Sequence, residues 1–88
     1  MRQIKLSGRE QAVIRSIDYA SGSTGAEIAA HTQLDPTDLA DLLHSLCDVG
    51  YLEPTPYTET INFSTYKDLR FEVNPAYAQD LKIALRRR

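Results

Sequence analysis

Apolar residues recur at helical spacing in the middle of the chain, between Asp35 and Gly50. Their spacing of i, i+3, i+4 and i+7 predicts one amphipathic helix, with a stripe formed by Leu39, Leu42, Leu43 and Leu46. Asp35 is expected to cap the N-terminus of this helix, Pro36 suits its first position, and Asp38 places a negative charge in its first turn. Gly50 is expected to end the helix in a left-handed conformation, before an extended segment that starts with the next two residues.

Two shorter helical segments precede this leucine-rich helix, and each begins with a capping box. Ser7 and Glu10 form the first box and predict a helix over about residues 8–20. Its apolar residues at helical spacing are Val13, Ile14, Ile17 and Ala20. Thr24 and Glu27 form the second box and predict a short helix that ends near Thr32. A turn of about three residues then leads to the leucine-rich helix, which is the arrangement of a helix-turn-helix.

Beyond Gly50 the apolar pattern changes from helical to extended. Residues 51–57 are expected to form a strand, and its two prolines favour an edge position or an early end. Residues 60–64 are a second candidate, and residues 69–73 alternate between apolar and polar side chains as strands do. Asn74 and Pro75 then start a C-terminal helix with the apolar residues Tyr77, Ala78, Leu81 and Leu85. This last stripe either covers the core or pairs with a second copy.

The predicted order of elements makes an α+β protein with a single domain over residues 1–88. The two capping boxes, the leucine stripe and the step from Gly50 through Tyr51 and Leu52 into a hairpin resemble the winged helix-turn-helix superfamily over about residues 7–85. The resemblance implies a three-helix core followed by a β-hairpin wing and a C-terminal helix. It also implies DNA binding, with the leucine-rich helix in the major groove and the wing near the phosphate backbone.

The length of 88 residues allows one domain with a small hydrophobic core. The single cysteine excludes an internal disulfide and is typical of a reducing compartment. The sequence has no apolar run of transmembrane length, and residues 1–6 are too polar for a secretory signal. We therefore expect a cytoplasmic protein without membrane association. The abrupt basic end at residues 86–88 leaves open that the chain is the N-terminal domain of a longer protein.

Charge is distributed unevenly along the chain, although the net charge is only −2. Residues 16–66 contain eight acidic residues and no lysine or arginine. Residues 1–15 hold four basic residues against one acidic residue, and residues 67–88 hold six against three. The two ends are therefore basic and the middle is acidic, which determines the partners that each surface attracts.

The outward face of the leucine-rich helix lies within this acidic middle. Besides Ala40, the face is expected to present a partner-binding set of Thr37, Asp38, Asp41, His44, Ser45 and Asp48. A helix that reads DNA usually offers Arg, Lys, Asn or Gln, whereas this one offers three carboxylates and no basic side chain. We therefore expect the face to bind a basic partner, either another protein or the basic ends of a second copy. Helix capping alone also explains Asp35 and Asp38.

The segment between the two hairpin strands holds several aromatic residues. Ile61 and Phe63 are expected to pack on the core, whereas Tyr57 and Tyr66 are expected to stay partly exposed and contact a partner. The expected wing contacts are Tyr57, Tyr66, Lys67 and Arg70. The neighbours of these aromatic residues are mainly Thr, Glu, Asn and Ser, which favours a protein partner over stacked nucleic acid bases.

Catalytic chemistry has little support in the sequence. His44, Cys47 and Asp48 are close along one helix, but a zinc site needs three or four convergent ligands, and His31 is the only other histidine. Cys47 lies at the edge of the leucine stripe and is expected to act as a small buried apolar residue. We thus expect no catalytic residue, metal or cofactor.

The sequence predicts a non-enzymatic regulatory or scaffolding module, and the alternative is a DNA-binding transcription regulator that docks through its basic ends and its wing.

Overall fold

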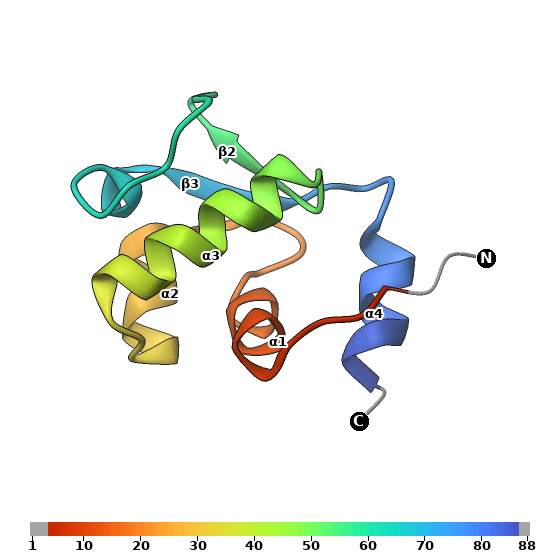
Figure 1. Cartoon of the computed structure of the whole chain (residues 1–88). Coiled ribbons are helices and arrows are strands. Elements are labelled where there is room, and N and C mark those ends of the chain that lie inside the picture. The colour runs from red at the N-terminus through yellow and green to blue at the C-terminus, as the bar shows by residue number, and fades with distance from the viewer. Residues whose placement is uncertain (1–3, 87–88) are drawn as a thin grey trace.

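The computed structural model describes residues 4–86, which form four α-helices, a three-stranded antiparallel sheet and one 3-10 helix (Figure 1). The α-helices are α1 (Gly8–Arg15), α2 (Gly25–Thr32), α3 (Pro36–Asp48) and α4 (Ala78–Arg86). The strands are β1 (Ser23–Thr24), β2 (Leu52–Thr55) and β3 (Arg70–Val73), and the 3-10 helix η1 (Tyr66–Asp68) precedes β3. The predicted α+β class is confirmed, and the order of elements is compatible with a small winged-helix-like fold.

The core lies between the three N-terminal helices, the sheet and α4. Leu39, Leu43 and Leu46 of the predicted stripe are buried, and Leu42 is half-buried. They pack with residues from the other elements: Val13, Ile14, Ile28, Leu52, Phe71 and Leu81. The expectation that Ala40 faces outward is wrong, because only 2% of it is exposed. Ala40 lies one turn before His44, on the side of α3 that the segment after β2 covers.

Both ends of α3 match the sequence prediction. Asp35 accepts a hydrogen bond from the backbone N–H of Thr37 at 3.1 Å, and Pro36 occupies the first turn. At the other end Gly50 has a φ of +95°, a conformation that costs glycine little. The N–H of Gly50 bonds to the carbonyl of Cys47, and the next N–H bonds to the carbonyl of Leu46. These two bonds form a Schellman motif and direct the chain into β2.

The helix predicted over residues 8–20 is shorter in the structure, since α1 ends at Arg15. The Ser16 hydroxyl donates to the carbonyl of Val13, and the carboxylate of Asp18 accepts from the backbone N–H groups of Ala20 and Ser21. These local hydrogen bonds replace another helical turn. The backbone hydrogen bond from Ala20, and to a smaller extent the one from Ser21, lowers the pKa of Asp18. Both predicted capping boxes, at the starts of α1 and α2, are present.

The sheet has the strand order β1-β3-β2, so that β2 is an edge strand. The sequence did not predict β1, which spans only two residues and pairs Ser23 with Phe71. In the β2–β3 ladder Glu53 is opposite Glu72, and Pro54 is opposite Phe71. The N–H of Asn74 bonds to the carbonyl of Tyr51, so these two opposite residues form a hydrogen-bonded pair. Hydrogen-bonded and non-hydrogen-bonded pairs alternate along an antiparallel ladder. Pro54 and Phe71, three positions along, are therefore a non-hydrogen-bonded pair, and the backbone nitrogen of Pro54 points away from β3. Pro54 therefore removes a hydrogen-bond donor from the outer edge of the sheet.

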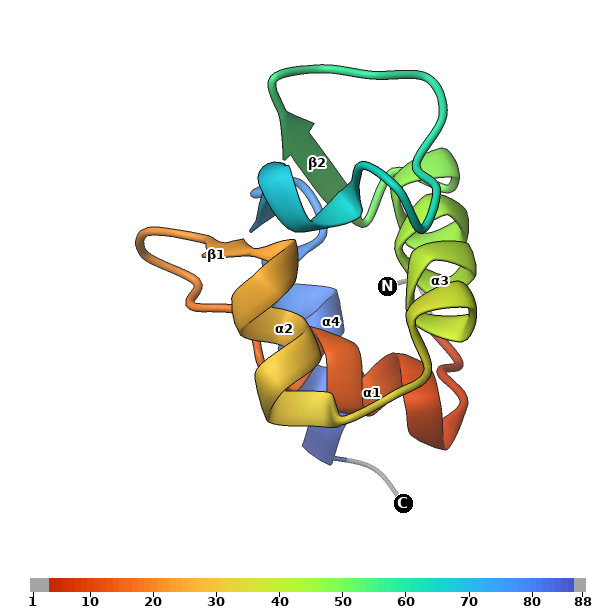
Figure 2. The same cartoon turned by 90° about the vertical axis from the view of Figure 1, so that its left-hand side faces the viewer.

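The segment after β2 crosses to α3 and returns through η1 to β3 (Figure 2). Residues 60–64 are not a strand, because the backbone and side-chain oxygens of Asn62 accept hydrogen bonds from the following residues and form a turn. Ile61 is buried as expected, but the positions expected for Phe63 and Tyr66 are wrong. Phe63 is 62% exposed, whereas Tyr66 is only 1% exposed. The turn places the backbone of Tyr66 against Gly25 of α2. The contact is so close that no side chain would fit at position 25.

The C-terminal helix also begins later than predicted, at Ala78. The side-chain oxygen of Asn74 accepts from the N–H of Ala76, and its amide nitrogen donates to the carbonyl of Gly50 at 2.8 Å. Asn74 thus holds a turn before α4 and connects it to the end of α3. Leu81 of α4 is fully buried, so this helix covers the core. None of the helices in residues 4–86 has the length and apolarity that crossing a bilayer requires.

Candidate functional site

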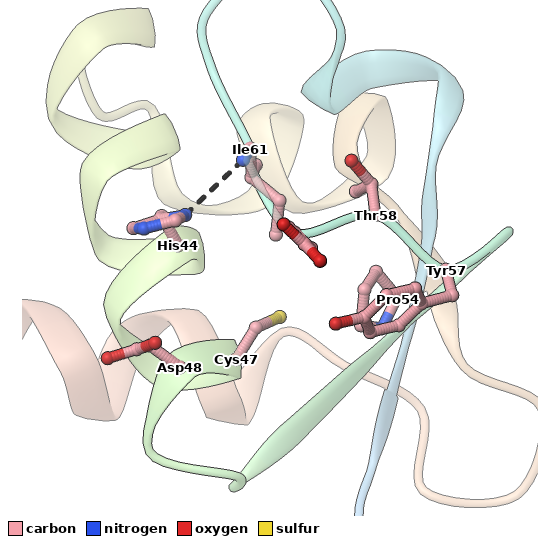
Figure 3. A pocket seen from close by; sticks show the side chains of 8 residues that line it. His44, Cys47, Asp48, Pro54, Tyr57, Thr58 and Ile61 are labelled. Atoms are coloured by element: carbon pink, nitrogen blue, oxygen red, sulfur yellow. Dashed lines mark hydrogen bonds between the residues drawn. The ribbon is translucent and has the colours of Figure 1, made fainter.

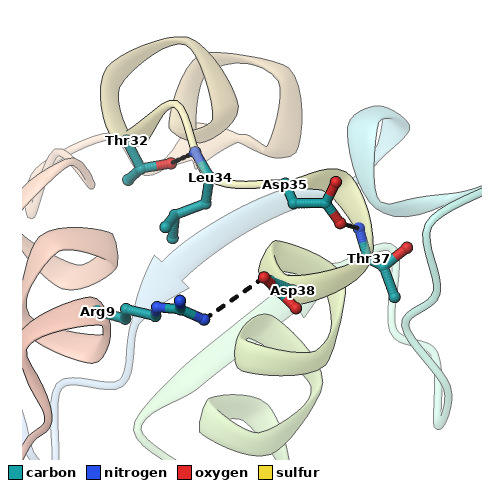
Figure 4. Close-up of polar contacts among 6 residues, drawn as sticks. All are labelled: Arg9, Thr32, Leu34, Asp35, Thr37 and Asp38. Atoms are coloured by element: carbon teal, nitrogen blue, oxygen red, sulfur yellow. Dashed lines mark hydrogen bonds and ion pairs between the residues drawn. The ribbon is translucent and has the colours of Figure 1, made fainter.

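The acidic residues of α3 divide into two groups. Asp38 pairs with the Arg9 guanidinium of α1 at 3.4 Å, and both side chains are about half exposed, so the pair is screened by solvent (Figure 4). Asp35 accepts the hydrogen bond that caps the helix. Asp41 and Asp48 are exposed and have no hydrogen-bond or ion-pair partner among the residues that the structure describes. The first turn of α3 therefore uses its carboxylates within the chain, and the rest of the helix does not.

The remaining predicted residues of this face differ in their surroundings. Thr37 and Ser45 are exposed, as expected. His44 is half-buried, and its Nδ1 accepts a hydrogen bond from the backbone N–H of Ile61 at 3.3 Å (Figure 3). Since Nδ1 is the acceptor, the neutral ring carries its proton on Nε2. His44 thus faces the segment after β2, and the predicted set of six residues does not form one open surface.

A groove lies between α3, β2 and the segment that follows β2 (Figure 3). One cavity of about 400 Å³ is lined by His44, Cys47, Asp48, Pro54, Tyr57, Thr58, Glu59 and Ile61. A second cavity of about 470 Å³ is lined by Cys47, Gly50, Leu52, Glu53, Pro54, Thr55, Tyr57, Glu72 and Asn74. The two cavities share Cys47, Pro54 and Tyr57, so they adjoin and form what we call the Tyr57 groove. Tyr57 is 78% exposed, and the wing contact expected there is available to a partner.

The Tyr57 groove is strongly acidic. Its first cavity holds Asp48 and Glu59, its second holds Glu53 and Glu72, and neither lining includes a lysine or an arginine. None of these four carboxylates has a hydrogen-bond or ion-pair partner within residues 4–86. Glu53 and Glu72 lie directly opposite each other in the sheet, which is an unfavourable arrangement of like charges. Asp48 is the last residue of α3, where the helix dipole also opposes a negative charge.

The sequence prediction missed Glu53 and Glu72 as members of the site. Both lie in strands and are separated by the segment that contains η1, so only the register of the β2–β3 ladder brings them together. A hairpin alignment that places Leu52 opposite Val73 would have paired the two glutamates. Their exposure follows from the alternation of side chains along each strand.

The other predicted wing contacts do not join Tyr57. Tyr66 is buried and cannot contact a partner, which corrects the expectation of an exposed side chain. The Arg70 guanidinium donates to the backbone carbonyls of Ser21 and Gly22 at 3.2 and 3.4 Å, so Arg70 stabilises the turn before β1. It lines a separate cavity between α1, α2 and β1. Lys67 is exposed on η1, outside the linings of both cavities of the Tyr57 groove.

Cys47 lines both cavities of the Tyr57 groove. It is half-buried, and burial, assisted by the nearby charge of Glu53, raises the pKa of the Cys47 thiol to about 12. The thiol therefore stays protonated at neutral pH and is a poor nucleophile and a poor metal ligand. Within residues 4–86, no three His, Cys, Asp or Glu side chains are grouped closely enough to hold a metal ion.

The environment of Cys47 leads to a prediction about its reactivity. In the native protein at pH 8, a disulfide reagent should modify Cys47 at least on the order of a hundredfold more slowly than in the urea-unfolded chain, where a thiol has a pKa of about 8.5. Absorbance of the released thiolate measures both rates. Equal rates in the two states would contradict the pKa that the structure assigns.

These features define a small α+β protein with an acidic, aromatic-containing groove beside its longest helix. Comparison of the chain with protein-family models, with curated proteins and with solved structures finds no match. We therefore infer its function from the groove and its charges.

Proposed function

We propose that this chain is a non-enzymatic winged-helix module that regulates or scaffolds other molecules by binding a basic segment of a protein partner. The binding surface is the Tyr57 groove together with the adjacent exposed residues of α3, Asp41 and Ser45. The observation that carries the proposal is the presence of four unpaired carboxylates around one exposed tyrosine, with no lysine or arginine in the groove. The single cysteine and the ordinary composition favour a cytoplasmic location.

A basic side chain fits the chemistry of this groove. A lysine or arginine that enters either cavity meets two carboxylates, and in the second cavity it relieves the repulsion between Glu53 and Glu72. The exposed ring of Tyr57 stands between the two cavities and can add a cation–π contact of about 0.5–2 kcal/mol. Such a partner would present at least two basic residues, one for each cavity.

The backbone at the β2 edge of the sheet argues against one way in which a peptide partner could bind. An extended peptide often adds a strand to an open edge and bonds to its backbone. In β2, Pro54 removes a donor from this edge, so strand addition is disfavoured there. The partner is therefore recognised through its side chains in the groove.

The alternative function is DNA binding through the basic ends and the Lys67 and Arg70 side of the wing. Arg70 is already bonded to backbone carbonyls, whereas Lys67 is exposed. Three arginines of the basic ends, Arg2, Arg87 and Arg88, lie outside the described residues. The outer face of α3 offers no cation to phosphates, which weighs against docking through this helix.

The test compares a basic peptide with DNA as probes. A synthetic peptide with paired lysines and arginines, labelled with a fluorophore, is titrated with the purified chain at low and at moderate salt. Replacing Asp48→Lys together with Glu53→Lys should weaken peptide binding about tenfold, because each reversal replaces an attraction by a repulsion. The control, Asp68→Lys with Asp80→Lys, has the same net charge and changes residues outside the groove. An equal loss in both variants would show non-specific attraction and refute the proposal.

A parallel titration with duplex DNA separates the two functions. We expect no measurable DNA binding at low salt. DNA binding that weakens steeply as salt increases, with no peptide binding, would favour the alternative.

A further inference from the structure

We propose that His44 is a pH-sensitive latch, whose protonation releases residues 57–61 from α3 and loosens the wall of the Tyr57 groove. The use of the Tyr57 groove for a basic partner rests on the proposed function. The latch concerns the unbound chain and can be tested without any partner.

The contact that forms the latch joins two distant parts of the chain. The backbone N–H of Ile61 donates to Nδ1 of His44 at 3.3 Å, across a separation of 17 residues (Figure 3). Among the described residues, this is the hydrogen bond that connects α3 with the segment between β2 and η1. Ile61 is 4% exposed and packs into the core beside it. The bond to His44 and the buried Ile61 side chain therefore both hold this segment against α3.

Histidine is the side chain that ordinarily changes its charge between pH 5 and pH 8. A proton from solvent that binds Nδ1 turns this atom from an acceptor into a donor. The imidazolium then faces the N–H of Ile61, donor against donor, and the hydrogen bond is lost. A buried backbone N–H without a partner is unfavourable, so the segment moves to let Ile61 reach water.

Carboxylates lie near His44 both on its own helix and in the segment across the cavity. On α3, Asp41 and Asp48 lie one turn away on either side, and Cys47 stays protonated. The segment after β2 contributes Tyr57 and Glu59 to the same cavity, and β2 contributes Pro54, which has no charge. No lysine or arginine lines this cavity. The imidazolium thus has carboxylates to approach once the bond to Ile61 is broken, and it places a positive charge where the basic partner would bind.

Nuclear magnetic resonance of the full, ¹⁵N-labelled chain tests the latch. At pH 7.5 long-range ¹H–¹⁵N spectra should show His44 with its proton on Nε2, and the Ile61 amide should be protected from exchange. At pH 5.5 the protection factor of Ile61, corrected for the intrinsic pH dependence of exchange, should fall about five- to tenfold, which corresponds to one lost hydrogen bond. The amide of the buried Ile14 should keep its protection, which shows that the whole chain has not unfolded.

Three variants make the result decisive. His44→Asn keeps an acceptor near the position of Nδ1 but cannot be protonated in this range, so the protection of Ile61 should not depend on pH. His44→Ala should show the lower protection at both pH values. His31→Asn removes the other histidine and should behave like the natural chain. A proton on Nδ1 at pH 7.5, or the same pH response in His44→Asn as in the natural chain, would overturn the proposal. Loss of peptide binding in the earlier test would leave this result unchanged.

Discussion

Replacing Tyr66 by alanine should lower the free energy of unfolding by about 4 kcal/mol, a typical cost of removing a large aromatic side chain from a core. Tyr66 is 1% exposed and belongs to the core, with its ring close to Gly25 of α2, although its position between polar residues in the sequence does not suggest burial. Removing the ring leaves a cavity beneath the segment that covers α3. Urea denaturation followed by circular dichroism measures the change.

Phe63→Ala is the matched control for this experiment. Phe63 lies three residues earlier in the same segment and is 62% exposed, so its loss should change the free energy of unfolding by no more than about 0.5 kcal/mol. If Phe63→Ala were the more destabilising of the two, Tyr66 would not be the core residue of this segment.

The second large effect is expected for Gly25→Ala, which should destabilise the chain by about 3 kcal/mol. A Cβ at position 25 would overlap the backbone carbonyl of Tyr66 and lie 2.7 Å from its carbonyl carbon and 2.9 Å from its ring. Gly25 is the first residue of α2, and its N–H bonds to the carbonyl of Leu69 at 2.9 Å, so neither backbone can move away cheaply. Thermal and urea unfolding both report the loss.

Gly8→Ala is the control, because Gly8 holds the equivalent first position of α1. No atom lies within 4 Å of the position that its Cβ would occupy. Alanine favours a helix over glycine by up to about 1 kcal/mol, so Gly8→Ala should be neutral or slightly stabilising. A similar loss of stability in both variants would mean that the effect belongs to the helix start and not to the contact with Tyr66.

Features that depend on neighbouring residues could be predicted from the sequence. The caps of α1, α2 and α3 satisfy backbone groups within three residues of the capping side chain, and all three are present. The leucine stripe of α3 and the left-handed Gly50 are also local signals, and both are confirmed in the structure. The repeating pattern of the helix was thus sufficient to find the element that carries half of the candidate site.

Features that depend on distant residues could not be predicted in this way. The exposed Phe63 and the buried Tyr66 exchange their expected positions because Asn62 forms a turn and Gly25 leaves room for the returning chain. Similarly, Glu53 and Glu72 become neighbours only through the strand register, and Arg70 is withdrawn from the wing by the carbonyls of Ser21 and Gly22. The local pattern therefore located the α3 wall of the groove and Tyr57, and missed the two glutamates of the strands.

The pairing of the short strand β1 with β3 affects how this chain folds while it is being synthesised on the ribosome. Ser23 pairs with Phe71, Gly25 bonds to Leu69, and the turn before β1 is held by Arg70, so the helical first half of the chain is joined to residues more than 40 positions later. Helices α1 to α3 can form early from their local signals, but their apolar faces stay open until β3 has left the exit tunnel. Folding of the first half is therefore completed by the last third of the chain, and contacts of such long sequence separation slow the final step.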